Sequence, residues 1–461
     1  MRHFRSLPKI SAITLIVSQA FLTVPVFAAG FQINEISPGL QGDALAGAAA
    51  ASNDVTAMFF NPATLATLQQ NQAYLGGSEI LPSVSMKDAS VIHTVNVPGI
   101  PPSSITATVL GQNYQSNIGQ STFVPDGYIG FRINDRLAAG LAIVAPFGLI
   151  TNYYENSVIR FAADYSAVKS IDLNPAIAYT INDHWALGIG FQAQYLRATF
   201  SNFNGPYTGI SDIDALIAPT HPTYLKGDGW GYGYTLGILY RPDLCTRIGL
   251  GYRSQISEQL DGDGQQYTSP GGTVPAPSQN FLFNAQTSVR ASVKTPAVLT
   301  LSGARDVSPA WTVKASIAYN FWDSFNQLSI KMPEAFATNS TIQTGWRNSW
   351  FGSLGADYRA TDQWTLRGGL AYDQTPTTSL RDPRIPDNDR YWLALGATYQ
   401  MNKHLSIDGA YEYIYIKDQK VNVTQASGSS ANSTVPLEVN QIYAKYKGSA
   451  NILGLAVRYS F

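Results

Sequence analysis

The chain of 461 residues has little charge, one cysteine and, beyond its N-terminal leader, no long hydrophobic run. Charged residues make up 13% of it, about half of the roughly 25% usual in globular domains. A surface that faces lipid tolerates such scarcity better than a surface that faces water. The net charge of −1 does not point to nucleic acid. Cys245 has no partner for an internal disulfide and is predicted to be a buried or shielded thiol.

No later window of roughly 18 apolar residues exists, so no transmembrane helix is expected. The leader itself resembles a secretory signal peptide, residues 1–28. It has a basic start with Arg2 and Arg5, an apolar stretch at Ile10–Leu22, and a small-residue cleavage site ending at Ala28.

Catalysis and metal binding find little support. None of the five histidines (His3, His93, His184, His221 and His404) forms a pair with metal-ligand spacing on a helix. No nucleophile and base stand in an evident motif. We therefore expect no catalytic residue, no metal site and no cofactor.

Aromatic residues, by contrast, are abundant at 12%, with 26 tyrosines. They fall in segments of about ten residues that alternate with period two, as in Trp364–Asp373, Trp185–Tyr195 and Leu405–Tyr415. Such a period places alternate side chains on opposite faces of a sheet. Apolar faces bounded by Trp and Tyr are typical of strands that cross a membrane.

About fourteen such segments follow Gln72, and short connections alternate with long ones. Asn134–Arg136 is a short connection, and residues 198–227 form a long one. An even number of strands lets a barrel close without a free edge. The sequence predicts an all-β fold, a transmembrane antiparallel β-barrel of about 14 strands at residues 69–461. Its last strand ends in Phe461.

The stretch Ala29–Leu68 differs from the rest, being small, apolar and rich in Ala and Gly. Asn53 or Asp54 can cap a short helix, and Asn61 followed by Pro62 is a second helix start. Forty such residues cannot bury their apolar surface alone. Residues 29–68 are therefore predicted to be an N-terminal plug of short helices in the barrel lumen.

The sequence AGFQINE at Ala29–Glu35, followed by Asn61-Pro62-Ala63, resembles the start of the outer-membrane long-chain fatty-acid transporter family (FadL/TodX type). The terminal aromatic strand residue also resembles the C-terminal signal of bacterial outer-membrane barrels. The family resemblance implies passive uptake of hydrophobic molecules across the bacterial outer membrane. It implies a hatch at Phe31, Asn61, Pro62 and Ala63, and a ligand pocket beneath Phe31, Phe59 and Phe60.

The third predicted strand meets Ala145-Pro146-Phe147-Gly148. Proline and glycine weaken strand pairing, so the strand either ends there or kinks. The resemblance favours a kink, since this family has one that opens the wall sideways. Pro146, Phe147 and Gly148 are the expected lateral opening.

Two long loops are unusually apolar, with Ile213, Leu216 and Ile217 in one and Phe281 and Phe283 in the next. They either fold their own loops or form a pair of facing patches, which would resemble the groove where the family first captures its ligand. Arg253, Arg290 and Lys294 are predicted on lumen faces, either as carboxylate-binding candidates or as partners of acidic residues. No motif of the family carries this cluster.

The expected ligand is a long-chain fatty acid or another hydrophobic molecule. The alternatives are an aromatic-hydrocarbon channel of the same family and a general water-filled porin, which would have no use for an apolar plug. Outer-membrane lipid surrounds the expected monomer, and the barrel-assembly machinery is expected to recognise Phe461.

Overall fold

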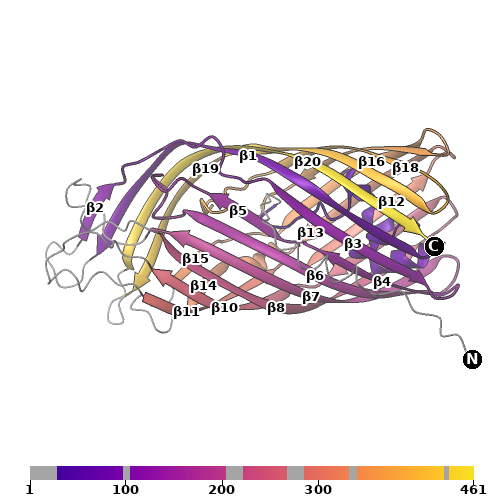
Figure 1. The fold of residues 1–461 in the computed structure, drawn as a ribbon, viewed down its shortest axis with the longest axis horizontal. Helices are drawn as coiled ribbons and strands as arrows, with labels where there is room; N and C mark the ends of the chain where they lie inside the picture. The colour runs from indigo at the N-terminus through magenta and orange to yellow at the C-terminus, as the bar shows by residue number, and fades with distance from the viewer. Residues whose placement is uncertain (1–28, 97–103, 204–221, 267–284, 332–339, 430–435) are drawn as a thin grey trace, which may run out of the picture.

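The structure is a computed structural model that describes residues 29–96, 104–203, 222–266, 285–331, 340–429 and 436–461. The predicted signal peptide lies outside these ranges. The chain forms one long, closed antiparallel barrel with short helices inside it near one end (Figure 1). The wall has 14 strands, so the predicted fold class is confirmed.

Nine wall strands are continuous: β1 (Gln72–Asn96), β3 (Thr122–Arg132), β6 (Tyr165–Thr180), β7 (Trp185–Asn202), β8 (Thr223–Tyr240), β17 (Trp364–Asp373), β18 (Arg390–Gln400), β19 (Leu405–Ser429) and β20 (Pro436–Ser460). β2 (Ser104–Thr108) pairs as a hairpin with the C-terminal end of β1, from Ile92 to Asn96. β1 closes the barrel by pairing with β20, from Gln72 opposite Ser460 upward.

The other wall strands are each made of two consecutive pieces: β4 (Leu137–Val144) with β5 (Gly148–Asn152), β9 (Thr246–Arg253) with β10 (Ile256–Gln266), β11 (Ala285–Thr295) with β12 (Val298–Asp306), β13 (Trp311–Asn320) with β14 (Gln327–Lys331), and β15 (Ser340–Gln343) with β16 (Ser349–Arg359). A 3-10 helix, η5 (Trp322–Phe325), separates β13 from β14. The sequence predicted a break only in the third strand.

Aromatic side chains form two belts on the outer surface. At the short-turn end, Trp185 stacks on Tyr240 with ring centroids 4.3 Å apart, and Trp311 on Tyr358 at 4.6 Å. Toward the long loops, Tyr372 lies 5.4 Å from Tyr391. Apolar side chains between the belts point outward, which matches the hydrocarbon layer of a membrane. The short turns then mark the periplasmic side and the long loops the extracellular side.

The plug consists of α2 (Pro38–Gln41) and three 3-10 helices, η1 (Ala48–Ala50), η2 (Val55–Phe59) and η3 (Pro62–Thr67). Asp54 caps η2 by accepting a hydrogen bond from the Thr56 N–H, and Asn61 caps η3 by accepting one from the Ala63 N–H. Both caps lie where the sequence placed helix starts. The helices sit inside the periplasmic half of the barrel (Figure 1).

Inward-facing glycines let the plug backbone approach the wall. A Cβ atom on Gly249 would lie 1.8 Å from the carbonyl oxygen of Ala49, and one on Gly251 would lie 1.8 Å from that of Phe60. The same clash with plug backbone would arise at Gly188, Gly355, Gly369 and Gly396. The plug therefore contacts this part of the wall without intervening side chains.

Two ion-pair clusters fasten the plug. Asp43 pairs with Lys314 of β13, whose ammonium also lies 2.7 Å from Asp357. Asp54 lies 3.0 Å from the Arg458 guanidinium of β20, which also contacts Asp408. Both clusters are largely buried, so breaking either would leave a charge without its partner.

None of the helices in the described ranges is long and apolar enough to cross a membrane. Cys245 is exposed in the turn between β8 and β9, so the prediction of a shielded thiol is wrong. The turn is too short to cover its own side chains.

Candidate functional site

The interruption predicted in the third strand is present. β4 pairs with β3 up to Ile143, opposite Gly127, but β5 pairs only with β6. Residues between Val144 and Gly148 therefore have no strand ladder to β3 beside them. Whether this gap passes ligand stays a prediction.

The first residues of the plug take up the backbone groups that the interruption leaves free. The Ile33 N–H donates to the Pro146 carbonyl oxygen at 2.7 Å, and the Gly148 N–H donates to the Phe31 carbonyl oxygen at 2.8 Å. Gln32 and Phe147 form a bridge between these two bonds. The wall interruption and the N-terminal segment of the plug are thus one hydrogen-bonded unit.

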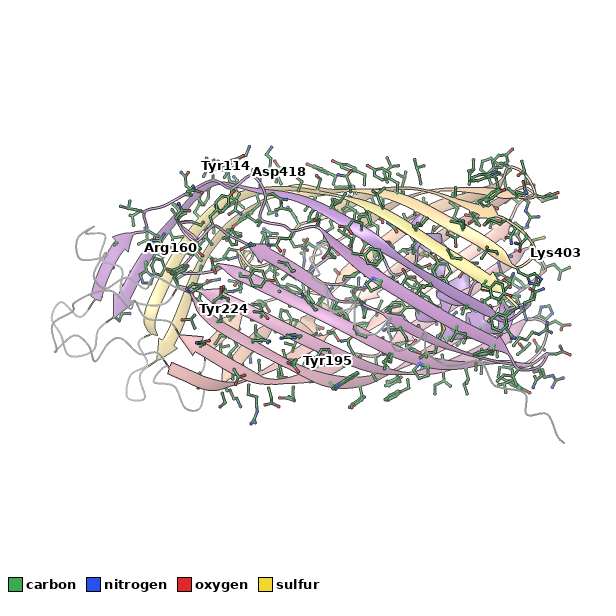
Figure 2. The ribbon with its side chains drawn as sticks, in the orientation of Figure 1. Tyr114, Arg160, Tyr195, Tyr224, Lys403 and Asp418 are labelled. Atoms are coloured by element: carbon green, nitrogen blue, oxygen red, sulfur yellow. The ribbon has the colours of Figure 1, made fainter. Side chains whose placement is uncertain are left out.

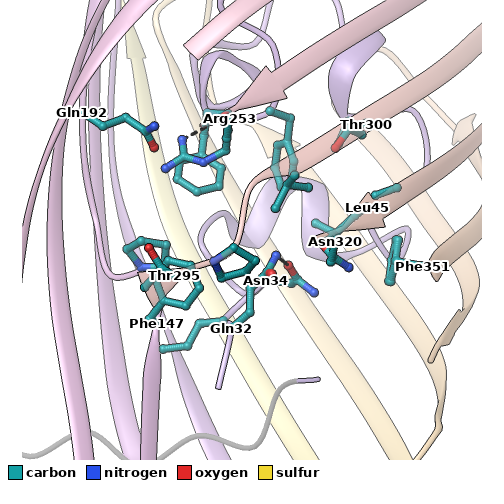
Figure 3. A pocket seen from close by; sticks show the side chains of 18 of the residues that line it. Gln32, Asn34, Leu45, Phe147, Gln192, Arg253, Thr295, Thr300, Asn320 and Phe351 are labelled. Atoms are coloured by element: carbon teal, nitrogen blue, oxygen red, sulfur yellow. Dashed lines mark hydrogen bonds between the residues drawn. The ribbon is translucent and has the colours of Figure 1, made fainter. Parts of the chain in front are cut away.

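A pocket opens inside the barrel where several strands break. Its lining includes Pro146 and Phe147, Ser254 between β9 and β10, Pro296 between β11 and β12, and Asn320 at the end of β13. Phe59 and Phe60 of the plug also line it, and ligand binding at these two residues stays a prediction. Figure 3 shows Arg253 and Gln192 on one side and Asn320 and Phe351 on the other.

This lower pocket holds a cavity of about 50 Å³. A single water molecule needs roughly 10–15 Å³ by the same measure, so the cavity admits a few waters. A long alkyl chain does not fit until side chains or the plug move aside.

Arg253 supplies the positive charge of the pocket. Its guanidinium lies 2.8 Å from the carboxylate of Asp172 on β6 and 3.6 Å above the ring of Phe59. It also donates to the Phe59 carbonyl oxygen at 3.2 Å. Gln192 and Gln194 of β7 line the same side. This side of the pocket is polar, while the rest is mixed, with Leu45 and Phe351 as apolar residues and Asn320 as a polar one.

Phe31 sits in an aromatic cluster formed by the broken ninth and tenth strands. Its ring centroid lies 4.9 Å from that of Trp322, 5.2 Å from Phe325 and 5.7 Å from Trp346. Phe147 of the interruption belongs to the same cluster, with its ring centroid 5.8 Å from that of Phe31 and 6.3 Å from that of Trp322. Phe31 is 2% exposed, so this ring holds the N-terminal segment in place.

A second, upper pocket of about 40 Å³ lies on the extracellular side of Phe31. Leu149, Val293, Leu328 and Ile342 make it apolar, and Asp382, Arg384 and Ile385 of the long loop before β18 border it. Phe31 lines the upper pocket, whereas Gln32 and Ile33 line the lower one. The N-terminal segment therefore separates the two.

The predicted basic cluster does not form. Arg253 faces the lumen, but Arg290 and Lys294 point outward, and Arg290 pairs with Asp261 on the barrel surface. Val289 and Val293 take the inward positions of β11 because the lumen is apolar at this level. This part of the wall lies beyond the membrane on the extracellular side. Its outer surface therefore faces water, and Arg290 and Lys294 point to that surface.

The remaining candidate site residues fall into two groups, those of the plug and those of the two apolar loops. Asn61, Pro62 and Ala63 are buried where the plug meets the wall, and the Asn61 amide donates to the carbonyl oxygens of Ala49 and Ile238. The apolar loop residues Ile213, Leu216, Ile217, Phe281 and Phe283 lie outside the described residues.

Trp322, Trp346 and Asp172 were missed by sequence reasoning. The available signal was the pair Phe321-Trp322, which places an aromatic side chain on each face of the sheet.

Glu35, two residues after Ile33, is buried in the lumen. Burial raises its pKa to about 7, although Arg390 of β18 opposes the shift. Glu412 of β19 and Asp373 of β17 are further buried carboxylates of this region. Within the described ranges, no group of three or more His, Cys, Asp or Glu side chains is arranged to hold a metal ion.

A lipid-facing barrel with a buried plug, an interrupted wall and an apolar pocket inside defines a plugged outer-membrane barrel for transport. The chain belongs to the family described as "Outer membrane protein transport protein (OMPP1/FadL/TodX)", whose profile matches residues 19–461. It is an outer-membrane protein of this transport family.

Its relatives include the "Long-chain fatty acid transport protein" of Escherichia coli O6:H1, 29% identical over 97% of this chain and 98% of that one. "Outer membrane protein P1" of Haemophilus influenzae is 28% identical over 94% and 95% of the two chains. Among solved structures, a Pseudomonas aeruginosa FadL homologue matches with a TM-score of 0.79 and 26% identity, over 94% of this chain and all of that one. The Ralstonia pickettii toluene transporter TbuX shares the fold, with a TM-score of 0.64, 18% identity and coverage of 93% and 99%.

Proposed function

We propose that this protein carries long-chain fatty acids across the outer membrane by passive diffusion. The observation that carries the proposal is the lower pocket, in which one basic side chain, Arg253, stands beside apolar residues such as Leu45 and Phe351. A fatty acid offers a matching pair of groups, one carboxylate and an alkyl chain. Fatty-acid transport in the E. coli relative supports this choice of ligand.

The proposed route runs from the extracellular loops through the upper pocket, past Phe31, to the lower pocket and out between Val144 and Gly148. A hydrophobic ligand gains about 0.8 kcal/mol for each methylene kept out of water. Release sideways into the membrane keeps that gain, whereas release into the periplasm loses it. Phe31 must leave its aromatic cluster for the ligand to pass.

Uptake of labelled oleate by cells that lack their own transporter tests the substrate. Cells that express the chain should take up oleate, and purified protein should bind it. Uptake of toluene alone would instead favour the second candidate, a channel for single aromatic rings. The small cavity and the aromatic cluster around Phe31 are the observations in favour of that candidate.

The variant Pro146→Val with Gly148→Val tests the route. Restored pairing should close the gap, so that oleate still binds to purified protein while uptake by cells falls. Transport at the wild-type rate would place the exit past the plug instead.

The proposal extends to processing and assembly. The mature chain begins at Ala29, works as a monomer, and is inserted by the barrel-assembly machinery through the strand that ends in Phe461. The Phe461 ring stacks on Tyr459 and meets Phe131 edge to face, so it lies on the outer surface where a partner can reach it. A water-filled porin is disfavoured, because the plug occupies the lumen.

A further inference from the structure

Five exposed lysines gather on one side of the barrel, on the three neighbouring strands β1, β20 and β19. We call this group the lysine patch; it consists of Lys87, Lys417, Lys420, Lys445 and Lys447. Strand register places Lys445 directly opposite Lys87 on one side and opposite Lys420 on the other. Three ammonium groups therefore stand in one row on one face of the sheet.

Like charges directly opposite one another destabilise a sheet, so negative charge near the row would stabilise it. Two carboxylates supply part of it: Asp88 lies 2.8 Å from Lys445, and Asp418 lies 2.9 Å from Lys447. Lys87 stands 6.0 Å from the ring centroid of Tyr114. Among the described residues, no other carboxylate forms an ion pair with the patch, which leaves a surplus of three positive charges.

The opposite wall is built differently. One row on that wall runs across six strands: Lys169 of β6, Arg197 of β7, Asp228 of β8, Asp261 of β10, Arg290 of β11 and Lys331 of β14. Two acids stand between its two pairs of bases, and Arg290 lies 2.7 Å from Asp261. The row of Lys87, Lys445 and Lys420 differs, because among the described residues no acid stands directly in line with it.

The lysine patch lies on the extracellular side of the aromatic belt that is nearer the long loops. Tyr415, an outward belt residue next to Tyr391, precedes Lys417 by two positions and pairs with Ser449. Both neighbours of β20 bulge at this height, at Lys87–Ser90 and at Ile416–Gln419, and the sheet bends there. Figure 2 shows Tyr114 and Asp418 at this bend, on the outside of the barrel. Aromatic belts mark the membrane interface, so the patch lies at the level of the extracellular head groups.

We propose that the lysine patch binds the phosphorylated head group of an outer-leaflet glycolipid, with the ammonium row of Lys87, Lys445 and Lys420 as the phosphate contact. Ammonium groups are point-charge donors to phosphate, and basic clusters next to a membrane interface recognise anionic head groups. The acyl chains of the same lipid would lie along the apolar outer faces of β1 and β20, below the belt.

Native mass spectrometry of the full chain with diphosphoryl lipid A tests the proposal. The variant Lys87→Gln, Lys420→Gln, Lys445→Gln should bind lipid A at least tenfold more weakly, which equals about 1.4 kcal/mol. The matched replacement of each with Arg keeps the charges and should keep binding. Monophosphoryl lipid A should bind more weakly than the diphosphoryl form, and phosphatidylcholine should not distinguish the variants.

A control variant, Lys226→Gln, Lys294→Gln, Lys331→Gln, removes three exposed lysines from the opposite wall and should bind like the wild type. Equal loss in both Gln variants would mean that only net charge matters and would overturn the site. Unchanged binding in the patch variant would overturn it too, as would full displacement of lipid A by an equal concentration of inorganic phosphate. Heat-modifiable migration on gels confirms that each barrel is folded.

Discussion

The Gly148 N–H donates to the carbonyl oxygen of Phe31 at 2.8 Å, which joins the interrupted wall to the first described residues of the plug. The side chain of Phe31 lies in an aromatic cluster on the far side of that bond. The position of the N-terminal segment thus depends on both a backbone bond and a buried ring, and each can be tested separately.

Phe31→Ala should release the N-terminal segment. Truncating a buried Phe costs about 3–5 kcal/mol, which exceeds what the two backbone bonds contribute at about 1 kcal/mol each. Hydrogen exchange in residues 29–36 should become faster, while exchange in β18 to β20 stays slow. Phe31→Leu fills part of the space and should give an intermediate rate. Unchanged exchange in Phe31→Ala would show that the cluster does not hold the segment.

Asn61 has two roles that substitutions can divide. Asn61→Asp keeps the oxygen that caps η3 but loses the amide that donates to Ala49 and Ile238. In Asn61→Asp a carboxylate oxygen also lies against these two carbonyl oxygens in a buried site, which costs more than a missing hydrogen bond. Asn61→Ala loses the cap and the amide bonds without adding a charge, and it leaves the Ala63 N–H without its acceptor, at about 1–3 kcal/mol. Thermal unfolding should therefore rank the wild type first, Asn61→Ala second and Asn61→Asp lowest, with faster leakage of small hydrophilic solutes in the same order. Equal unfolding temperatures would contradict a structural role for this motif.

Arg253 and Asp172 should affect acids and neutral ligands differently. Arg253→Gln removes the positive charge of the lower pocket, so oleate affinity should fall about tenfold while oleyl alcohol binds as before. Asp172→Asn should raise the affinity for oleate, because it leaves a buried guanidinium without its partner, which is strongly destabilising. We expect this variant to melt earlier alone and to gain more than the wild type from added oleate. Equal weakening of both ligands by Arg253→Gln would make the ion pair purely structural.

Glu35 predicts a pH dependence of the plug. Burial raises its pKa from the ordinary 4.5 to about 7, so between these values the folded state holds a proton that the unfolded chain has lost. The contribution of Glu35 to stability is therefore greatest below about pH 4.5 and falls as pH rises to 7. Hydrogen exchange of residues 29–36, corrected for its intrinsic pH dependence, should accelerate from pH 5 to 7.5. Glu35→Gln should flatten the profile, and an equally steep profile would point to Glu412 or Asp373 instead.

Alternation with period two was sufficient to predict the barrel, because lipid on one side and a filled lumen on the other impose it on every strand between the belts. The caps at Asp54 and Asn61 were readable for a local reason, since a side chain and its own helix decide them. The breaks near Ser254 and Trp322 were not predicted because outward residues on both sides of each break still alternate. Arg290 was predicted on the wrong face because we assumed that charged residues point into a water-filled lumen. At this level Val289 and Val293 fill the lumen instead.

The wall glycines that touch plug backbone limit the order in which this protein can be made. A forty-residue segment that fits against Gly249, Gly251 and Gly369 without room for a methyl group could enter a finished barrel only in an unfolded form. The plug also precedes β1, the strand that closes the wall by pairing with β20. We therefore expect biogenesis to finish with that seam, which would join the first and last strands around a plug that is already folded.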